Sequence, residues 1–283
     1  SIAKEAKENK KNLTIAICRP LAHEAIAAAL YMPDEVYQSV QQIWVYQREA
    51  SDMVANLIDK NNAIKYYNKI MFTQNKCLVQ YCKHNALSTF DENGMMTNEK
   101  GYCLDHIPNP GKSKEEIYNY INSTQTIIGL NAAGIIFDNI NFSNKVFIGC
   151  NFSHCTFTNI QSEELRLRMC IFDFANFTDC NFIKSNTMFS SFSGCTFSHT
   201  LFTTSDLIHT NYNGIKTYQS SFDNSDLFNS RFIKATLVDT SFRNCNVKKT
   251  MFIDINQTNV SFKMSNTREA IFDKEGSELF QGI

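Results

Sequence analysis

The spacing of apolar residues changes near residue 126 and divides the chain into two parts. Upstream, apolar residues recur three or four positions apart, the period of an amphipathic helix, whereas downstream they recur every five positions. The upstream part therefore predicts a small helical domain with intervening loops. The predicted helices cover residues 34–60, 62–72, 76–84 and 113–124, the last with Ser113 as its N-cap, and the predicted loops cover 88–102 and 107–113.

Downstream, the period of five can be followed in two interleaved registers without an insertion or deletion. The first register reads Phe142, Phe152, Phe172, Phe182, Phe192, Phe202, Tyr212, Phe222, Phe232, Phe242, Phe252, Phe262 and Phe272, and it is interrupted at Ser162. The second reads Phe137, Phe147, Phe157, Leu167, Phe177, Phe197, Leu207, Leu227, Leu237 and Val247, with polar residues at Thr187, Thr217, Gln257 and Thr267. A repeat this strict is typical of a solenoid, in which each unit packs on its neighbours.

A small residue, usually Cys, Ser, Thr or Ala, precedes most of the large ones by two positions. Six of the ten cysteines take this small position: Cys150, Cys155, Cys170, Cys180, Cys195 and Cys245. We therefore expect these thiols to fill a narrow core. Cys150 and Cys170 take equivalent positions of the repeat twenty residues apart, and two thiols are expected there rather than a disulfide.

The large central residue with a small residue two positions earlier resembles the pentapeptide-repeat family, over roughly residues 130–275. The resemblance implies a right-handed quadrilateral β-helix, in which each five-residue unit makes one side and four units make one coil. We therefore expect a mixed fold: an N-terminal all-α domain (1–125), a pentapeptide-repeat β-helix of about seven coils (126–275) and a C-terminal tail (276–283). At roughly 4.8 Å per coil, the rod would be on the order of 34 Å long.

Charge and composition narrow the classes of partner. The chain carries 27 basic and 28 acidic residues, for a net charge of −1, and residues 126–283 carry 13 basic against 14 acidic ones. This balance argues against a nucleic-acid partner and against an acidic rod that mimics DNA. The longest apolar run, residues 25–32, is shorter than the roughly 18 residues of a membrane span, and we expect no Sec signal. Ten cysteines spread over the chain favour reduced thiols and an intracellular compartment.

One column of outward residues is unexpectedly apolar for a rod surrounded by water. Residues twenty positions apart align on successive coils, and most outward columns are polar. The exception, called here the outward stripe, reads Ile148, Arg168, Met188, Ile208, Phe228, Lys248 and Arg268, and the adjoining corner column adds Met169, Phe189 and His209. We predict that a partner protein binds at Arg168, Met169, Met188, Phe189, Ile208, Phe228 and Lys248, and at Leu279 and Phe280 of the tail. The alternative is that the helical domain packs on the stripe.

The break at Ser162 lies beside a charged segment. Glu163, Glu164, Arg166 and Arg168 follow it at outward positions. Three interpretations remain open at this point: a bulged coil, a contact surface or a solvated charge cluster.

Cysteines and histidines upstream of the repeat raise the question of a metal. Cys77, Cys82, His84, Cys103 and His106 form the pattern C-x4-C-x-H followed by C-x2-H. Zinc sites use such ligands, but usually in C-x2-C pairs, so the loose first spacing favours no metal and no cofactor. A cysteine nucleophile assisted by a histidine and Asp105 is a second reading. No cysteine-protease signature, phosphate loop or other catalytic motif accompanies it, so an enzyme is not the favoured prediction.

The order of the predicted domains extends the resemblance. A helical region followed by a pentapeptide rod and a short tail resembles the pentapeptide-repeat effectors that bacterial pathogens inject into host cells, some of which recruit host motor or trafficking proteins. The resemblance implies a non-enzymatic scaffold for a host or bacterial protein, secreted into the host cytoplasm or else retained in the bacterial cytoplasm. Two alternatives are the substrate-docking part of an effector similar to HECT ubiquitin ligases and a gyrase-protecting DNA mimic.

Overall fold

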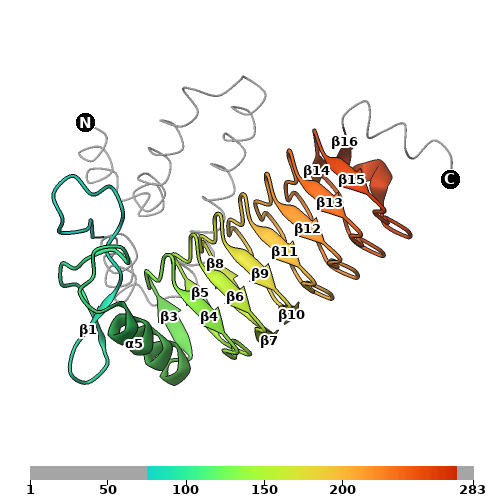
Figure 1. Ribbon diagram of the computed structural model, residues 1–283. Coiled ribbons are helices and arrows are strands. Elements are labelled where there is room, and N and C mark those ends of the chain that lie inside the picture. The colour runs from blue at the N-terminus through green and yellow to red at the C-terminus, as the bar shows by residue number, and fades with distance from the viewer. Residues whose placement is uncertain (1–74, 273–283) are drawn as a thin grey trace, which may run out of the picture. The chain divides into compact units, whose positions relative to one another are not determined.

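The computed structural model describes residues 75–272 (Figure 1). The helices predicted at 34–60 and 62–72, and the tail with Leu279 and Phe280, lie outside these residues. The described chain has two parts: a segment called here the cap, residues 75–124, and a right-handed β-solenoid of about seven turns that begins at Thr126.

The cap is not the all-helical structure that the sequence predicts. It contains one α-helix, α5 (Pro110–Ser123), and one antiparallel pair of short strands, β1 (Thr89–Phe90) and β2 (Met96–Thr97). The predicted helix over 113–124 is confirmed, but it begins earlier. The Asn109 side chain accepts a hydrogen bond from the Lys112 amide at 3.0 Å, so Asn109 and not Ser113 is the N-cap.

The helix predicted over 76–84 is wrong. These residues form a tight antiparallel turn in which the Cys77 amide donates to the His84 carbonyl at 3.0 Å and the Cys82 amide donates to the Val79 carbonyl at 3.1 Å. The apolar residues of this segment, Leu78, Val79 and Tyr81, are exposed and form no buried face.

Strands of the solenoid pair in parallel with the strand twenty residues further along, which gives four faces. The first face is a sheet of β4 (Ile136–Asp138), β6 (Thr156–Thr158), β9 (Asn176–Thr178), β11 (Thr196–Ser198), β12 (Lys216–Tyr218), β13 (Thr236–Val238) and β15 (Asn256–Thr258). The second face holds β7 (Gln161–Glu163) and β10 (Asn181–Ile183), and the third holds β3 (Thr126–Ile128), β5 (Val146–Ile148) and β8 (Arg166–Arg168). The fourth face holds β14 (Met251–Phe252) and β16 (Ile271–Phe272), and a short 3-10 helix, η1 (Thr267–Glu269), lies in the last coil. Isolated parallel bridges continue the second, third and fourth faces between these strands.

The corners between the faces have a left-handed backbone. Each fifth residue from Gly129 to Met264 has a positive φ. This conformation turns the chain sharply and is favoured by Gly, Asn and Asp, which occupy many of these corners. Bulky side chains at the same corners therefore sit on a backbone conformation that they disfavour.

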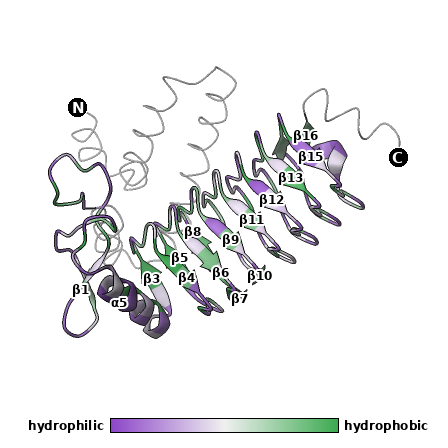
Figure 2. Ribbon diagram, in the orientation of Figure 1, coloured by the Kyte–Doolittle hydropathy of each residue, from purple (hydrophilic) through white to green (hydrophobic). Residues whose placement is uncertain are grey.

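The interior consists of aromatic columns, as the sequence predicts. Rings one coil apart stack face to face, for example Phe157 on Phe177 at 4.7 Å and Phe222 on Phe242 at 4.9 Å between ring centroids. Neighbouring columns meet edge to face, a favourable arrangement for aromatic quadrupoles. The strands differ in their overall hydropathy: β5 is hydrophobic, whereas β12 and β15 are hydrophilic (Figure 2).

The small inward position is a hydrogen-bonding position as well as a filler. The Cys155 thiol donates to the Ala132 carbonyl at 3.1 Å, twenty-three residues earlier, and the Ser225 hydroxyl donates to the Phe202 carbonyl at 2.7 Å over the same separation. The other cysteines at this position make the same bond, and all described cysteines are free thiols. Cys, Ser and Thr thus satisfy a buried carbonyl that Ala cannot reach.

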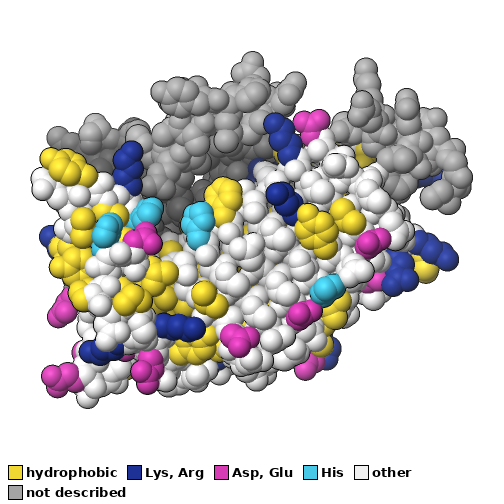
Figure 3. Space-filling model, in the orientation of Figure 1, with side chains coloured by type: hydrophobic (Ala, Val, Ile, Leu, Met, Phe, Trp, Pro, Cys, Tyr) yellow, Lys and Arg dark blue, Asp and Glu magenta, His cyan; other side chains and the backbone are white. Residues whose placement is uncertain are grey.

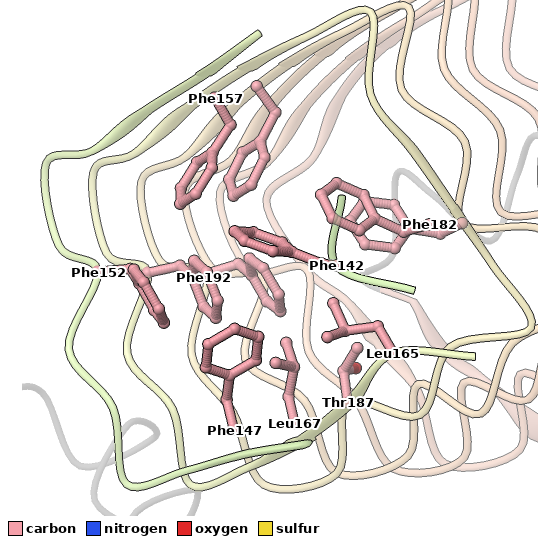
Figure 4. A pocket seen from close by; sticks show the side chains of 12 residues that line it. Phe142, Phe147, Phe152, Phe157, Leu165, Leu167, Phe182, Thr187 and Phe192 are labelled. Carbon is pink, nitrogen blue, oxygen red and sulfur yellow. The ribbon is translucent and has the colours of Figure 1, made fainter. Parts of the chain in front are cut away.

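The break at Ser162 does not produce a bulge. Ser162 pairs in register with Phe182, so the coil keeps its length. Because no ring projects from Ser162, a gap opens between the rings of Phe142 and Phe182, and Leu165 projects into this part of the core from a position that usually holds a small residue (Figure 4). Because the Leu165 side chain fills part of the volume that a ring at position 162 would occupy, the core stays packed and the repeat continues past the break.

The first coil is covered by α5. Its residues Ile117, Tyr120 and Ile121 are buried and join the interior of the solenoid. The Tyr118 ring stacks on Phe137 at 5.3 Å between centroids. A terminal repeat without such a cover would expose the end of the core to water.

Candidate functional site

The outward stripe lies along the third face of the solenoid, on one side of successive coils. Arg168 is the last residue of β8, and Met188, Ile208 and Phe228 occupy the equivalent place in the next three coils. These four residues are half-buried, whereas Lys248 is exposed. The structure thus brings together the predicted site residues of the solenoid, while Leu279 and Phe280 lie outside the described residues.

The corner column beside the stripe carries large side chains on a left-handed backbone. Met169, Phe189 and His209 have φ angles of 53°, 58° and 55°. A side chain without a local polar group is disfavoured in this conformation by roughly 1–2 kcal/mol relative to glycine. The backbone at Phe189 and Met169 is therefore strained. Residues held in such conformations cluster at functional sites, so the outward surface of these two side chains is a candidate binding surface.

Aromatic rings connect the corner column to the stripe across three coils. Phe189 stacks on His209 at 5.1 Å with an interplanar angle of 19°, and His209 meets Phe228 edge to face at 5.6 Å. The Lys249 ammonium lies over the Phe228 ring, 5.7 Å from its centroid. Phe189, His209, Phe228 and Lys249 are called here the aromatic ridge. His209 and Lys249 are absent from the site predicted from the sequence. Both belong to the corner column, because His209 lies one coil and Lys249 three coils after Phe189.

The charge state of the ridge is set by burial. Burial lowers the pKa of His209 to about 4; Asp226 opposes this shift, whereas Arg231 and Lys249 add to it. The Asn229 amide nitrogen lies 2.9 Å from His209 Nδ1. At neutral pH the histidine is therefore an uncharged aromatic ring, and the positive charge of the ridge belongs to Lys249.

Basic residues flank the apolar middle of the stripe, Met188, Ile208 and Phe228. The Arg168 guanidinium donates to the Asn186 side chain at 2.7 Å, and burial lowers its pKa. Lys248 forms an ion pair with Glu269 at 2.9 Å, and hydrogen bonding from Lys248 lowers the pKa of that carboxyl group. The stripe is thus an apolar surface between cationic groups.

A second aromatic pair, which the sequence did not single out, lies at the corner between the fourth and first faces. The exposed Phe174 ring stacks on His154 at 5.3 Å. On the other side the ring lies directly over Gly194, where an added Cβ would meet it at 2.6 Å. Any larger residue at this corner would therefore displace the Phe174 ring.

The structure also brings together four of the five weak metal candidates. Cys77, Cys82, Cys103 and His106 have their ligand atoms within 4.8 Å of one another. The fifth, His84, pairs with Asp105 at 3.1 Å, and the ligand atoms of both lie within 4.8 Å of the Cys103 sulphur. Hydrophobic side chains and histidines gather on the surface of the cap, at the left of Figure 3.

Local hydrogen bonds polarise these sulphur atoms. Burial opposes ionisation of Cys77, but the amides of Cys103 and Val79 bond to its sulphur and, with the His106 side chain, lower its pKa to about 6. Burial raises the pKa of Cys103 to about 11. In the solenoid, burial raises the pKa of Cys180 and Cys245 to about 11, so those thiols are poor nucleophiles.

Two family models match the solenoid. One describes a pentapeptide repeat region and matches residues 197–272, and the other describes pentapeptide repeats in eight copies and matches residues 170–207. A search of curated proteins finds no match. Within residues 75–272, no helix has the length and apolar character needed to cross a membrane.

Several solved structures are similar to parts of the chain. A trypsin-treated variant of QnrB1, a plasmid-mediated fluoroquinolone resistance protein, is 16% identical, with a TM-score of 0.30 over 53% of this chain and 86% of its own. HetL, a pentapeptide repeat protein involved in heterocyst differentiation regulation in Nostoc sp. strain PCC 7120, is 15% identical, with a TM-score of 0.20 over 56% and 97%. A pentapeptide repeat protein of the Arabidopsis thaliana thylakoid lumen is 14% identical, with a TM-score of 0.20 over 43% and 68%.

Proposed function

We propose that this chain, whose repeat region belongs to the pentapeptide repeat family, is a protein-binding scaffold that engages its partner along the outward stripe and the aromatic ridge. The observation that supports this most is the aromatic ridge itself. Phe189 occupies a left-handed corner that other residues would fill more favourably, and its ring continues through His209 to Phe228. Aromatic side chains with charged neighbours are the groups that most often dominate protein interfaces.

The chemistry of the stripe defines the partner. Met188, Ile208 and Phe228 would take apolar side chains, while Arg168 at one end and Lys249 at the other would attract carboxylates. We therefore propose a partner segment with an apolar centre and acidic ends.

A setting for this interaction follows from the sequence resemblance alone. We propose that the chain is a bacterial effector and that the partner is a host protein in the host cytoplasm. No specific observation favours the gyrase-protecting DNA mimic, because residues 126–283 carry 13 basic against 14 acidic residues and so lack the acidic excess of such a mimic. None favours the substrate-docking part of a HECT-like ligase either, because the described residues include no ligase lobe.

The test is the double substitution Ile208→Asp and Phe228→Asp. Two carboxylates on the stripe would repel an acidic partner and place unpaired charge in the interface, so we expect partner capture to fall at least about tenfold, the equivalent of 1.4 kcal/mol. Capture is compared in quantitative pull-downs from host and bacterial lysates, with circular dichroism to show that the fold is retained. The matched control is Tyr218→Asp with Val238→Asp, at the equivalent positions of the first face.

The outcomes separate the possible roles of the stripe. Loss of the same host protein from the stripe variant alone supports the proposal, and a protein lost only from the bacterial lysate would overturn the effector setting. Equal capture by both variants would overturn the binding role. A stripe variant that loses stability or becomes sensitive to limited proteolysis would identify the stripe as an internal packing surface.

A further inference from the structure

The cap contains two short turns that meet at their cysteines. The first turn places Cys77 and Cys82 on one side, and the second, closed by a hydrogen bond of 3.1 Å from the His106 amide to the Cys103 carbonyl, places Cys103 beside His106. Across the turns, Cys82 Sγ lies 3.8 Å from Cys103 Sγ, and Cys77 Sγ lies 3.6 Å from His106 Nδ1. Cys103 Sγ lies 3.2 Å from the same nitrogen. Two pairs of residues from separate turns thus converge on one point.

These separations fit a tetrahedral zinc site. With Zn–S near 2.3 Å and Zn–N near 2.0–2.1 Å, tetrahedral angles place two sulphur ligands about 3.8 Å apart and a sulphur and a nitrogen about 3.6 Å apart. The observed Cys82–Cys103 and Cys77–His106 distances match these values. Among these three distances, the one from Cys103 to His106 is shorter, and the remaining pairs of ligand atoms lie within 4.8 Å of one another.

The thiols of the cap differ from those of the solenoid in their surroundings. Each described cysteine of the solenoid donates to a backbone carbonyl of the preceding coil. Cys77 and Cys103 instead face other members of the cluster: His106 Nδ1 for Cys77, and Cys82 Sγ and His106 Nδ1 for Cys103.

Other uses of the cluster account for fewer of its members. A disulfide between Cys82 and Cys103 would leave Cys77 and His106 facing each other without a role. A nucleophile would need a group to orient His106, but the neighbouring Asp105 is paired with His84 at 3.1 Å, and Cys77 is buried.

We propose that Cys77, Cys82, Cys103 and His106 bind one zinc ion in a structural site of the cap. Three sulphur ligands and one nitrogen fill a tetrahedral shell and leave no open position for a substrate. Binding releases the protons of the thiols to solvent. His106 is exposed and gives the ion a route to the cluster, while Cys77 and Cys103 are buried.

The zinc site would fasten the cap to the solenoid. Leu104, between the ligands Cys103 and His106, packs against the first coil, where an added Cβ at Gly134 would meet it at 2.9 Å. The same region is joined to the coil by Asn131, whose amide donates to the Ser88 hydroxyl at 2.9 Å. Fixing the second turn therefore holds Leu104 against the first coil.

The experiment measures zinc in the full chain purified under reducing conditions. We expect about one zinc per chain by elemental analysis, and a cobalt-substituted protein with thiolate-to-cobalt charge-transfer absorption. The single substitutions Cys82→Ser and His106→Asn should each remove most of the bound metal. Chelation of the unchanged protein should lower the melting temperature and increase proteolysis within residues 75–109.

Two controls keep the assignment falsifiable. His84→Asn, beside the cluster, and Cys180→Ser, in the solenoid, should retain full zinc content. Loss of zinc in His84→Asn would overturn this ligand set. A folded, reduced protein that binds neither zinc nor cobalt would overturn the site, as would a Cys82–Cys103 disulfide mapped by mass spectrometry in protein isolated without reductant. If Cys82→Ser fails to fold, cobalt titration of the unchanged chain still decides the matter.

Discussion

Single residues at the corners of the solenoid distinguish structural from functional positions. Asn, Asp and Gly tolerate the left-handed backbone well, and they occupy corners such as Asn144, Asp179 and Gly214. Phe174 and Phe189 do not share this tolerance, yet each stacks on a histidine one coil away. Stacking on the histidine offsets part of the backbone strain. The strain that is left indicates that the rings at these corners are retained for their surface chemistry.

The hydroxyl group of Ser162 is buried without a hydrogen-bond partner among the described residues. Replacing Ser162 by Ala removes this unpaired group with little loss of packing, so we expect the free energy of unfolding to rise by about 1 kcal/mol in chemical denaturation. Ser205→Ala is the matched control: its hydroxyl donates to the Phe182 carbonyl at 3.1 Å and accepts from the Ser185 amide at 2.9 Å. We expect it to lower stability by about 1–2 kcal/mol, and a decrease for both variants would contradict the interpretation of Ser162.

His209 makes the stability of the molecule dependent on pH. Its pKa is lowered from 6.5 to about 4 by burial, so the unfolded chain binds a proton that the folded chain does not. Its stabilising contribution is therefore complete above pH 6.5 and is lost as pH falls towards about 4. His209→Asn, which suits the left-handed corner, should flatten this part of the stability profile.

NMR titration of the imidazole checks the assignment directly, since other groups also titrate in this range. An ordinary pKa for His209 would contradict the buried, uncharged ring.

At the scale of elements, the first coil shows how the solenoid begins. Strand β4 pairs with β6 on one side only, which leaves its other edge open. Tyr118 of α5 covers that edge: its hydroxyl donates to the Ile136 carbonyl at 3.1 Å and accepts from the Asp138 amide at 2.8 Å. One side chain thus replaces the hydrogen bonds of a missing strand.

Tyr118→Phe keeps the ring stacked on Phe137 but removes both hydrogen bonds to β4. We expect the free energy of unfolding to fall by about 1–2 kcal/mol. Hydrogen exchange should show faster exchange of the Asp138 amide. Tyr218→Phe is the control, because that exposed hydroxyl has no hydrogen bond to any described residue. Equal effects of the two variants would contradict the role given to Tyr118.

The elements differ in how far the sequence predicts them. The solenoid is predictable because the interior accepts only one residue pattern, so Phe142 to Phe272 identify their own register. The first turn of the cap is not, because Leu78, Val79 and Tyr81 have helical spacing but point to solvent. Short antiparallel turns have no periodicity, and the hydrogen bonds that close them, such as that of Cys77 to His84, leave no trace in the pattern of side chains.

At the scale of the whole molecule, the candidate sites also differ in how far the sequence predicts them. The outward stripe could be predicted once the twenty-residue coil was known, because that length aligns Met188, Ile208 and Phe228. The convergence of Cys77 and Cys82 on Cys103 and His106 could not, because it depends on two irregular turns meeting in space. Ligand spacing alone argued against a metal, whereas the distances between the ligand atoms argue for one.

Because every coil has the same length, the outward columns repeat at a constant spacing along the axis of the solenoid. In the described coils each strand pairs in parallel register with the residues twenty positions further along. A duplication or loss of one whole coil would leave all four faces aligned and would shift everything downstream along the axis by about 4.8 Å. Any other change in length would rotate the downstream faces out of line. The distance between Arg168 and Lys248 is thus a quantity that evolution can adjust in whole steps, matching the reach of the surface to the length of whatever lies along it.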